Sequence, residues 1–313
     1  MALIKLKPAC KDYLWGGDRL IREYHKPYEG DRLAETWELS CHSDGPSVIA
    51  EGEGMGLTLQ EYIDREGKEI LGENCSKFAD FPILIKMIDA KDDLSIQVHP
   101  DNDYALEHEG QYGKTEMWYV MDCEEGAFLY YGFQVPVDQR EFAERIQNNT
   151  LTDVLRKVYV KKGDVLFIEA RTIHAIGKNI MVAEIQQNSN VTYRVYDYGR
   201  KGADGKCREL HIEKALAVTN TDPILKEKSF SPHIAKCDYF TVDKIYLDGS
   251  SMKRLNGYAG KESFVHLLVI EGEGAVWSGS QVLSLAKGDS VFIPAGSGEF
   301  EITGELEVLM TRV

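Results

Sequence analysis

Two short stretches of the chain, residues 95–99 and 114–118, carry side chains whose types and spacing could do chemistry. In an extended strand alternate side chains point to the same side, so each stretch presents a set of polar groups on one face. These faces hold Ser95, Gln97 and His99 in the first stretch and Lys114, Glu116 and Trp118 in the second. His174, further along the chain, adds a second imidazole. Two histidines and one glutamate are the ligand types of a catalytic zinc site with an open coordination position, and non-haem iron is the second metal that they suit.

The three candidate ligands His99, Glu116 and His174 each have a simpler interpretation when taken alone. A histidine that precedes a proline can cap a turn, and a strand glutamate can face water. All three nevertheless lie at the starts or ends of predicted strands, where the mouth of a β-barrel opens, and Gln97 shares the face of His99. The pattern therefore predicts a metal site, provided that the fold brings the three residues together.

Further side chains could bind an anion. Phosphate prefers fork-like donors and hydroxyls, and Lys86, Arg200 and Ser95 supply such groups. Lys86 is the one lysine in the apolar run 81–88, where such a side chain more often reaches solvent at the edge of a sheet. Arg194 alternates with aromatic neighbours, so stacking on tyrosine rings explains it equally well.

The composition is that of an acidic globular protein. Its 313 residues would suit one large or two medium domains. The net charge of −15, from 51 acidic and 36 basic residues, disfavours non-specific binding to nucleic acid or to anionic membranes. We find no apolar run long enough to span a bilayer and no signal-peptide segment at the N-terminus. The six cysteines form no C-x-x-C pair, which indicates reduced thiols, and we expect a cytoplasmic protein.

Periodicity and turn residues predict many short strands and a few short helices. The predicted strands cover residues 34–40, 81–88, 95–99, 114–120, 127–134, 159–168 and parts of 180–198. The predicted helices cover residues 57–63, 101–109, 137–146, 152–157 and part of 204–218. In the first of these helices, Thr58 and Glu61 have the spacing of a capping box.

A repeat in the second half suggests how the domains are organised. The segment KGDVLFIEAR at 162–171 recurs as KGDSVFIPAG at 287–296. Two copies of one strand-rich unit predict a mainly β protein with two jelly-roll domains of the cupin type and a few short helices. We place the metal-binding catalytic domain at 1–225 and a C-terminal jelly roll at 226–313. The second copy has Glu299 where the first has its second histidine, so we expect it to be metal-free.

Ordered motifs run along nearly the whole chain. They are Trp15-Gly16-Gly17, Glu35-Thr36-Trp37-Glu38-Leu39-Ser40, Ser95-Ile96-Gln97-Val98-His99-Pro100, Gly113-Lys114-Thr115-Glu116-Met117-Trp118-Tyr119, Thr172-Ile173-His174-Ala175, Gln186-Gln187-Asn188-Ser189 and Tyr193-Arg194-Val195-Tyr196-Asp197. In these motifs the chain resembles the type I mannose-6-phosphate isomerases of the cupin superfamily, and the short bacterial form especially. The resemblance implies interconversion of mannose 6-phosphate and fructose 6-phosphate through a cis-enediol(ate), with one zinc ion per chain.

The resemblance also implies a role for each matching residue. The residues that fall on the family's positions are His99, Glu116 and His174 for the zinc ligands, Gln97 for a fourth ligand, Arg194 for the active-site arginine, Lys114 for an acid/base lysine, and Ser95, Lys86 and Arg200 for the substrate phosphate. The chain departs from the family in the loop 169–172, where Glu-Ala-Arg-Thr replaces the usual Pro-x-Gly-Thr. Larger members carry lysine in place of Arg200 and a long helical domain that is missing here.

Two other classes of protein use similar residues. One is an iron-dependent cupin oxygenase, which the absent H-x-H spacing and the surplus of phosphate-suited cations disfavour. The other is a non-catalytic sugar-phosphate-binding cupin, which the complete ligand set disfavours. We expect a small sugar phosphate as the partner, no nucleic acid or membrane, and a monomer or weak homodimer.

Overall fold

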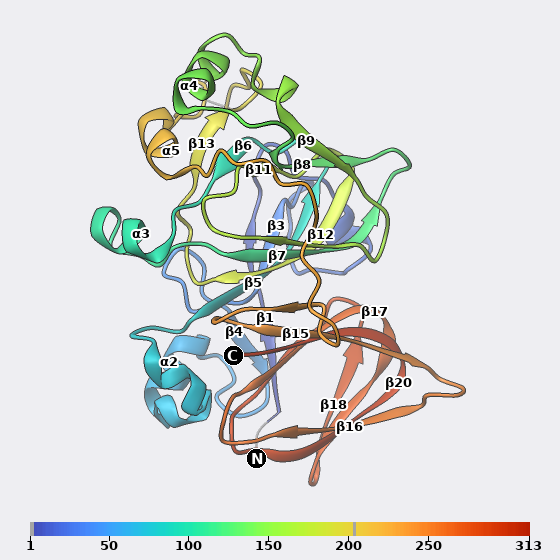
Figure 1. Cartoon of the computed structure of the whole chain (residues 1–313). Coiled ribbons are helices and arrows are strands. Elements are labelled where there is room, and N and C mark those ends of the chain that lie inside the picture. The colour runs from blue at the N-terminus through green and yellow to red at the C-terminus, as the bar shows by residue number, and fades with distance from the viewer. Residues whose placement is uncertain (1–2, 203–204) are drawn as a thin grey trace.

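The computed structural model describes residues 3–202 and 205–313, which form mainly β-structure (Figure 1). The strands are β1 Ile4–Lys7, β2 Ala9–Lys11, β3 Glu35–Leu39, β4 Val48–Glu51, β5 Ile83–Ala90, β6 Ile96–Val98, β7 Glu116–Cys123, β8 Phe128–Phe133, β9 Leu155–Tyr159, β10 Val165–Ile168, β11 His174–Ala175, β12 Ile180–Gln187, β13 Tyr193–Tyr196, β14 Ala235–Lys236, β15 Thr241–Asp248, β16 Arg254–Ala259, β17 Val265–Ser278, β18 Gln281–Ala286, β19 Ser290–Ile293 and β20 Gly298–Arg312. The helices are α1 Arg19–Arg22, α2 Leu59–Glu66, α3 Asn102–His108, α4 Gln139–Gln147 and α5 Ile212–Val218, with short 3₁₀ turns at Lys68–Leu71, Glu73–Lys77 and Leu151–Asp153.

Two antiparallel sheets form the upper part of Figure 1. One has six strands in the order β10-β7-β12-β5-β3-β2, and the other has five in the order β13-β6-β11-β8-β9. A buried cluster joins their facing sides, with Trp118 and Val182 from the first sheet and Leu129 and Tyr131 from the second. The two sheets therefore enclose an interior, as in a jelly roll.

The six-stranded sheet is buried on both faces. In β5, β7 and β12 the side chains alternate between the interior just described and a second core on the outer face. In that second core Ile85, Met117 and Ala183 belong to the same cluster as Phe240 and Phe292 of the C-terminal part. Because both faces are covered, a polar side chain on these strands needs a partner inside the protein.

The lower part of Figure 1 is a nine-stranded sheet that curls around a core of its own. Most of its strands come from the C-terminal third, in the order β14-β15-β20-β17-β19-β1-β4, with β16 on β20 and β18 on β17. The N-terminal strands β1 and β4 extend this sheet, since β1 pairs with β19 and β4 pairs with β1. Sequence patterning gave no sign of this crossing, and the division at 225/226 stays a prediction.

Helices α4 and α5 cover the outer face of the five-stranded sheet. Phe142 of α4 packs edge-on against Phe133 of β8, and Ala215 of α5 lies in the same buried cluster as Val98 and Tyr193. These two helices pack against the five-stranded sheet, which contains β6, β11 and β13, and hold it in place. No helix in the described part of the chain is long and apolar enough to cross a membrane.

Some of the predicted helices are present in the structure and others are not. The capping box of α2 is present, since the Thr58 hydroxyl accepts from the Glu61 backbone and the Glu61 carboxylate accepts from the Thr58 backbone. The prediction over 152–157 is wrong beyond the 3₁₀ turn that ends at residue 153, because residues 155–159 pair with β8 as strand β9. In the predicted 204–218 segment the helix begins at Ile212, and residue 204 lies outside the described residues.

Candidate metal centre

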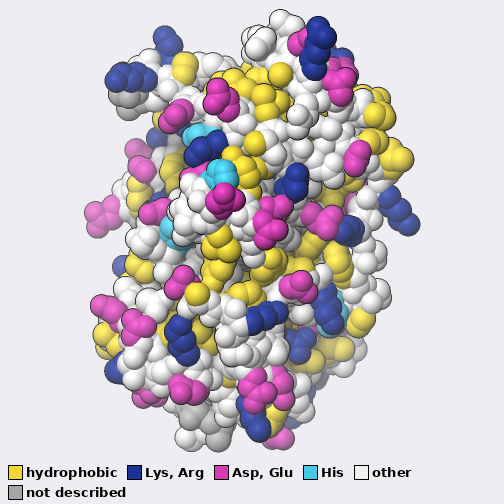
Figure 2. Space-filling model, turned by 60° about the vertical axis from the view of Figure 1, so that its left-hand side comes forward, with side chains coloured by type: hydrophobic (Ala, Val, Ile, Leu, Met, Phe, Trp, Pro, Cys, Tyr) yellow, Lys and Arg dark blue, Asp and Glu magenta, His cyan; other side chains and the backbone are white. Residues whose placement is uncertain are grey.

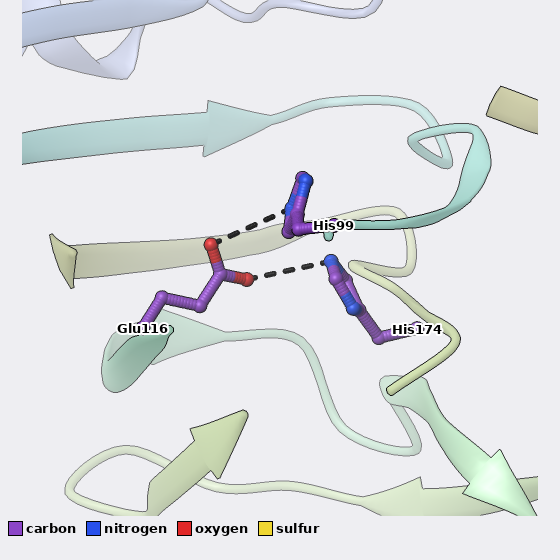
Figure 3. Close-up of side chains that lie close together, drawn as sticks. All are labelled: His99, Glu116 and His174. Carbon is purple, nitrogen blue, oxygen red and sulfur yellow. Dashed lines mark ion pairs between the residues drawn. The ribbon is translucent and has the colours of Figure 1, made fainter. Parts of the chain in front are cut away.

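The three candidate ligands converge in the interior between the two upper sheets (Figure 3). Glu116 begins β7, His174 begins β11, and His99 directly follows β6. The Nε2 atom of His99 lies 3.6 Å from Glu116 Oε2, and the Nε2 atom of His174 lies 3.4 Å from Glu116 Oε1. One ligand atom from each residue lies within 4.8 Å of the others, and all three residues are buried. The three residues therefore lie close together, as the sequence predicts.

Backbone carbonyls orient both histidines. The Nδ1 atom of His99 donates to the carbonyl of Val191, and that of His174 donates to the carbonyl of Thr172, each at 2.8 Å. With the proton on Nδ1, the lone pair of each ring lies on Nε2, which faces Glu116. Burial is the main cause that lowers the pKa of His99 well below its usual value and that of His174 to about 4. Both rings are thus neutral at pH 7, as metal ligation requires.

Glu116 has one close cationic partner among the described residues. Lys114 Nζ lies 2.6 Å from its Oε2, whereas its Oε1 accepts no hydrogen bond from the described residues. Burial, together with the nearby charge of Glu184, raises the pKa of Glu116 to about 7. Two buried ammonium groups, of Lys86 and Lys114, pair with three buried carboxylates, of Glu35, Glu116 and Glu184. One negative charge beside the two imidazole lone pairs is therefore not balanced. The residues therefore fit a divalent cation.

A row of opposed residues crosses the six-stranded sheet beside the ligands. Glu184 of β12 lies directly opposite Lys86 of β5 on one side and Trp118 of β7 on the other. Trp118 Nε1 donates to Glu184 Oε2 at 2.8 Å, and the Nζ atoms of Lys86 and Lys114 each lie 3.4 Å from Oε1. Burial acts to raise the pKa of Glu184, but the two ammonium groups outweigh it and hold that pKa at about 2. Sequence reasoning missed Glu184, although a lone carboxylate in an apolar strand was the available signal.

Lys86 does not reach solvent at a sheet edge. Its strand β5 lies between β12 and β3, and its side chain is 5% exposed. Its Nζ lies 3.5 Å from Glu35 Oε2 and 4.9 Å from the centre of the Trp37 ring. The solvent-reaching interpretation is thus wrong. The described contacts place Lys86 beside Glu35 and Glu184 and do not join it to Ser95 or Arg200, so its phosphate role stays a prediction.

Arg194 lies next to the ligands through strand pairing. It is directly opposite Gln97 on β6, and Gln97 Nε2 is 3.5 Å from Nε2 of His174. Arg194 Nε donates to the Ser95 hydroxyl at 3.2 Å, and its Nη1 donates to the carbonyl of Glu209 at 3.0 Å. The structure therefore brings together Gln97, Ser95 and Arg194 beside His174. Stacking on tyrosine rings is not needed to account for this arginine.

Arg200, the remaining predicted phosphate ligand, is engaged by acceptors of its own chain. Its Nη2 donates to Asp197 Oδ1 and its Nη1 donates to the carbonyl of Asp93, each at 2.5 Å. Arg208 shares the carboxylate of Asp197 and was missed by sequence reasoning. No periodic strand or helix signal surrounds it, so only its charge marks it in the sequence.

A mainly β chain with a buried His₂Glu set inside a two-sheet barrel defines a cupin-type protein with a candidate metal centre. Comparison with known families is more specific. Residues 3–127 match the family described as phosphomannose isomerase type I, catalytic domain, and residues 231–313 match that described as mannose-6-phosphate isomerase, cupin domain. The chain belongs to the type I mannose-6-phosphate isomerase family.

Individual relatives agree along the whole chain. The mannose-6-phosphate isomerase ManA of Bacillus subtilis is 38% identical, with 98% of each chain covered. That of Streptococcus mutans is 36% identical over 96% of this chain and 94% of its own. A crystal structure of the Bacillus subtilis mannose 6-phosphate isomerase superposes with a TM-score of 0.90 at 34% identity, covering 100% of both chains. The predicted family, isomerase class and cupin-type fold are thereby confirmed.

Proposed function

We propose that this chain interconverts mannose 6-phosphate and fructose 6-phosphate with one zinc ion held by His99, Glu116 and His174. The single observation that carries the proposal is the buried Glu116 carboxylate, whose oxygens lie 3.6 Å from His99 Nε2 and 3.4 Å from His174 Nε2. The relatives of similar length bear the name of this activity. Imidazole and carboxylate ligands suit zinc best among common metals. Gln97 is our proposed fourth ligand, since its amide lies beside His174.

A bound zinc ion would supply a Lewis acid that polarises the oxygens of the open-chain sugar. The remaining work is proton transfer. Removal of the C2 proton from the aldose leaves its electron pair in a C1–C2 double bond, which gives the cis-enediol(ate). A proton added to C1, with the O2 proton passed to O1, then gives the ketose. A positioned acid/base group contributes about 10²–10⁴-fold to such a step.

Lys114 is our proposed acid/base group. It is buried, and its Nζ lies 3.2 Å from His99 Nε2 and 3.4 Å from Glu184 Oε1. Glu184 and Trp118 fix this end of the site by their hydrogen bond, so the amine is held against the ligands rather than in solvent. We assign Lys114 the proton carried between C1 and C2.

Arg194 is proposed to stabilise the negative charge that develops on the substrate oxygens. Its guanidinium is anchored on Ser95 and on a backbone carbonyl, and it faces Gln97 across the strand pair. Fixed positive charge in a site that excludes water is worth more than in solvent. We expect Arg194→Ala to keep its fold and metal and to lose roughly 10²–10³ in kcat, as when a single oxyanion donor is removed. Near-wild-type turnover in folded, metal-loaded Arg194→Ala would contradict this role.

The proposed function is tested by a coupled assay on purified protein, which follows mannose 6-phosphate with and without a chelator. Turnover that the chelator abolishes and zinc restores would support both the reaction and the metal. Stoichiometric iron with oxygen consumption would favour a cupin oxygenase instead. Stoichiometric zinc without turnover would favour a sugar-phosphate-binding protein or another phosphosugar as substrate.

We also infer a cytoplasmic enzyme that works as a monomer or weak homodimer, with no nucleic acid or membrane partner. The net charge of −15 supports the lack of polyanionic partners. Acidic and basic side chains are interspersed over the face shown in Figure 2, without a broad basic surface. Size-exclusion chromatography with light scattering would test the oligomeric state.

A further inference from the structure

Two arginines share one buried carboxylate close to Arg194. Asp197, which is 6% exposed, accepts two hydrogen bonds from Arg208, from Nε at 2.7 Å and from Nη2 at 2.6 Å. The same carboxylate accepts from Arg200 Nη2 at 2.5 Å. The fork-like pairing with Arg208 fixes the plane of that guanidinium, and side chains held in this way lose little further entropy when they bind a ligand. Asp197 therefore holds two cations in set orientations.

The segment that carries Arg208 is fastened along β13 beside Arg194. The backbone N–H of His211 donates to the carbonyl of Arg194 at 2.8 Å, and the backbone N–H of Arg194 donates to His211 Nδ1 at 3.3 Å. The carbonyl of Glu209 accepts from Arg194 Nη1 at 3.0 Å. Arg208 directly precedes Glu209 in the chain, so it lies at the same end of the site as Arg194.

The cluster concentrates positive charge in an acidic protein. Arg200 and Arg208 both pair with the Asp197 carboxylate, and Arg194 lies near enough for that carboxylate to influence its pKa, so there is a local excess of two positive charges over Asp197 while the whole chain carries −15. Burial lowers the pKa of Arg194, and the charge of Arg208 adds to the effect, whereas that of Asp197 opposes it. Of the neighbouring acids, Asp93 accepts from the Lys178 backbone through its own carboxylate. The carboxylate of Glu209 belongs to an exposed residue.

Donor availability distinguishes the three arginines. Arg200 donates through both terminal nitrogens to its own chain, and its Nε, which has no partner among the described residues, is buried. Within residues 3–202 and 205–313, Nη1 of Arg208 and Nη2 of Arg194 donate no hydrogen bond. The side chain of Arg208 is 29% exposed, so its unused donor is open to a ligand. An unused pair of guanidinium donors next to a serine hydroxyl suits a phosphate monoester, which carries a charge of about −2.

We propose that Arg208 is a phosphate-binding residue of this enzyme, acting with Arg194 and Ser95, and that Asp197 is the positioning residue that orients it. The assignment rests on the proposed function and names the group that would hold the phosphate end of the sugar. It also changes the role of Arg200, which neutralises Asp197 instead of contacting substrate. From Gln97 beside the candidate metal ligands to Ser95 just before β6, an extended chain advances about 7 Å, a span that suits an open sugar chain lying along the strand.

The test compares Arg208→Gln with Arg156→Gln in the full-length, zinc-loaded protein. Arg156 is a matched control because its side chain is 23% exposed and pairs with Glu227 at 2.5 Å. It also lies on β9, at the opposite edge of the same sheet from β13. Each variant is assayed for KM and kcat with mannose 6-phosphate and for competitive inhibition by inorganic phosphate. Phosphate binding is also measured by calorimetry, which needs no turnover.

For Arg208→Gln we expect KM and the inhibition constant of phosphate to rise together by roughly 10- to 100-fold, the worth of one charge-assisted hydrogen bond. We expect a smaller change in kcat, because the phosphate is bound alike in substrate and transition state. Arg208→Lys keeps the positive charge but cannot form the two-pronged guanidinium pairing. Its KM and phosphate inhibition constant should fall between those of the wild type and Arg208→Gln. This variant also provides the test if Arg208→Gln does not fold. Arg156→Gln should match the wild type.

Two results would overturn the assignment. One is a loss of kcat in both Arg208 variants with KM and phosphate inhibition as in Arg156→Gln, which would show that Arg208 only fastens its loop. The other is calorimetric phosphate binding that is equal in the wild type and in Arg208→Gln. If the wild type binds phosphate through Arg208 and does not turn over mannose 6-phosphate, the proposed function fails and the phosphate site stands.

Discussion

Lys26→Met is expected to destabilise the protein by about 3–5 kcal/mol at pH 8, the usual result of removing one partner of a buried ion pair. Lys26 Nζ lies 2.5 Å from Glu38 Oε1 and donates to the carbonyl of Gly288 at 2.6 Å, so it joins β3 to the turn before β19. The side chain of Glu38 is fully buried, and its Oε2 already lacks a hydrogen bond among the described residues. Methionine keeps the aliphatic stem and leaves Glu38 with the hydroxyl of Thr36, at 2.6 Å.

The loss of unfolding free energy in Lys26→Met should depend on pH, and the burial of Glu38 determines whether the loss grows or shrinks as the pH falls. Burial raises the pKa of Glu38, and the Lys26 ammonium opposes that rise. Without Lys26 the pKa rises further. A carboxyl group whose pKa is higher in the folded state than in the unfolded state lowers the stability at pH values above the folded-state pKa. This destabilisation disappears as the pH falls below the folded-state pKa. Lys26→Met should therefore be less destabilised at pH 5 than at pH 8.

The measurement is denaturant unfolding of the wild type, Lys26→Met, Glu38→Gln and the double variant at both pH values. Glutamine can still accept from Thr36 without a charge, so the double variant should recover most of the stability that Lys26→Met loses at pH 8. A deficit below about 1 kcal/mol, as for exposed pairs, would refute the reasoning. So would an equal deficit at both pH values with no coupling between the two sites.

Two further predictions concern the metal centre and a helix end. Glu116→Gln should abolish stoichiometric metal binding, measured by elemental analysis, and yet unfold at no lower denaturant concentration than the metal-free wild type. The reason is that Lys86 and Lys114 still face the carboxylates of Glu35 and Glu184, so charges balance without Glu116; a large loss of stability would contradict this. Thr58→Ala removes the cap of α2 and should cost about 1 kcal/mol in unfolding free energy, whereas an unchanged midpoint would show that the capping box contributes nothing.

Local rules were enough to pick out the candidate metal ligands in the sequence, although not to show that they meet in space. The period of two along a strand put Gln97 and His99 on one face, and the position of Glu116 at a strand start put it at a barrel mouth. What orients the histidines was not predictable, because the acceptor for His99 is the carbonyl of Val191, a backbone atom that no residue type reveals. The roles assigned by resemblance remain predictions until activity and metal content are measured.

Pairing between distant strands accounts for most of what the sequence did not show. Residues 155–157 have a helix-compatible pattern, yet they form a strand because β8 offers an unpaired edge. Strands β1 and β4 likewise join the C-terminal sheet through β19, although nearly the whole chain separates β1 from β19. Local propensity is a weak guide where a neighbouring strand can satisfy the backbone.

Lys86 and Glu184 show how such pairing could be predicted better. Each strand has an unexplained charge within an apolar run, Lys86 in β5 and Glu184 in β12, and for Lys86 the commonest explanation is a sheet edge. Both strands are buried on both faces, so an isolated charge on either would cost several kcal/mol. Opposite charges on two such strands therefore favour the register in which they meet, and β5 and β12 pair with Lys86 directly opposite Glu184. Opposite charges within the apolar runs of two buried strands are thus a signal for strand pairing that hydrophobic periodicity alone does not contain.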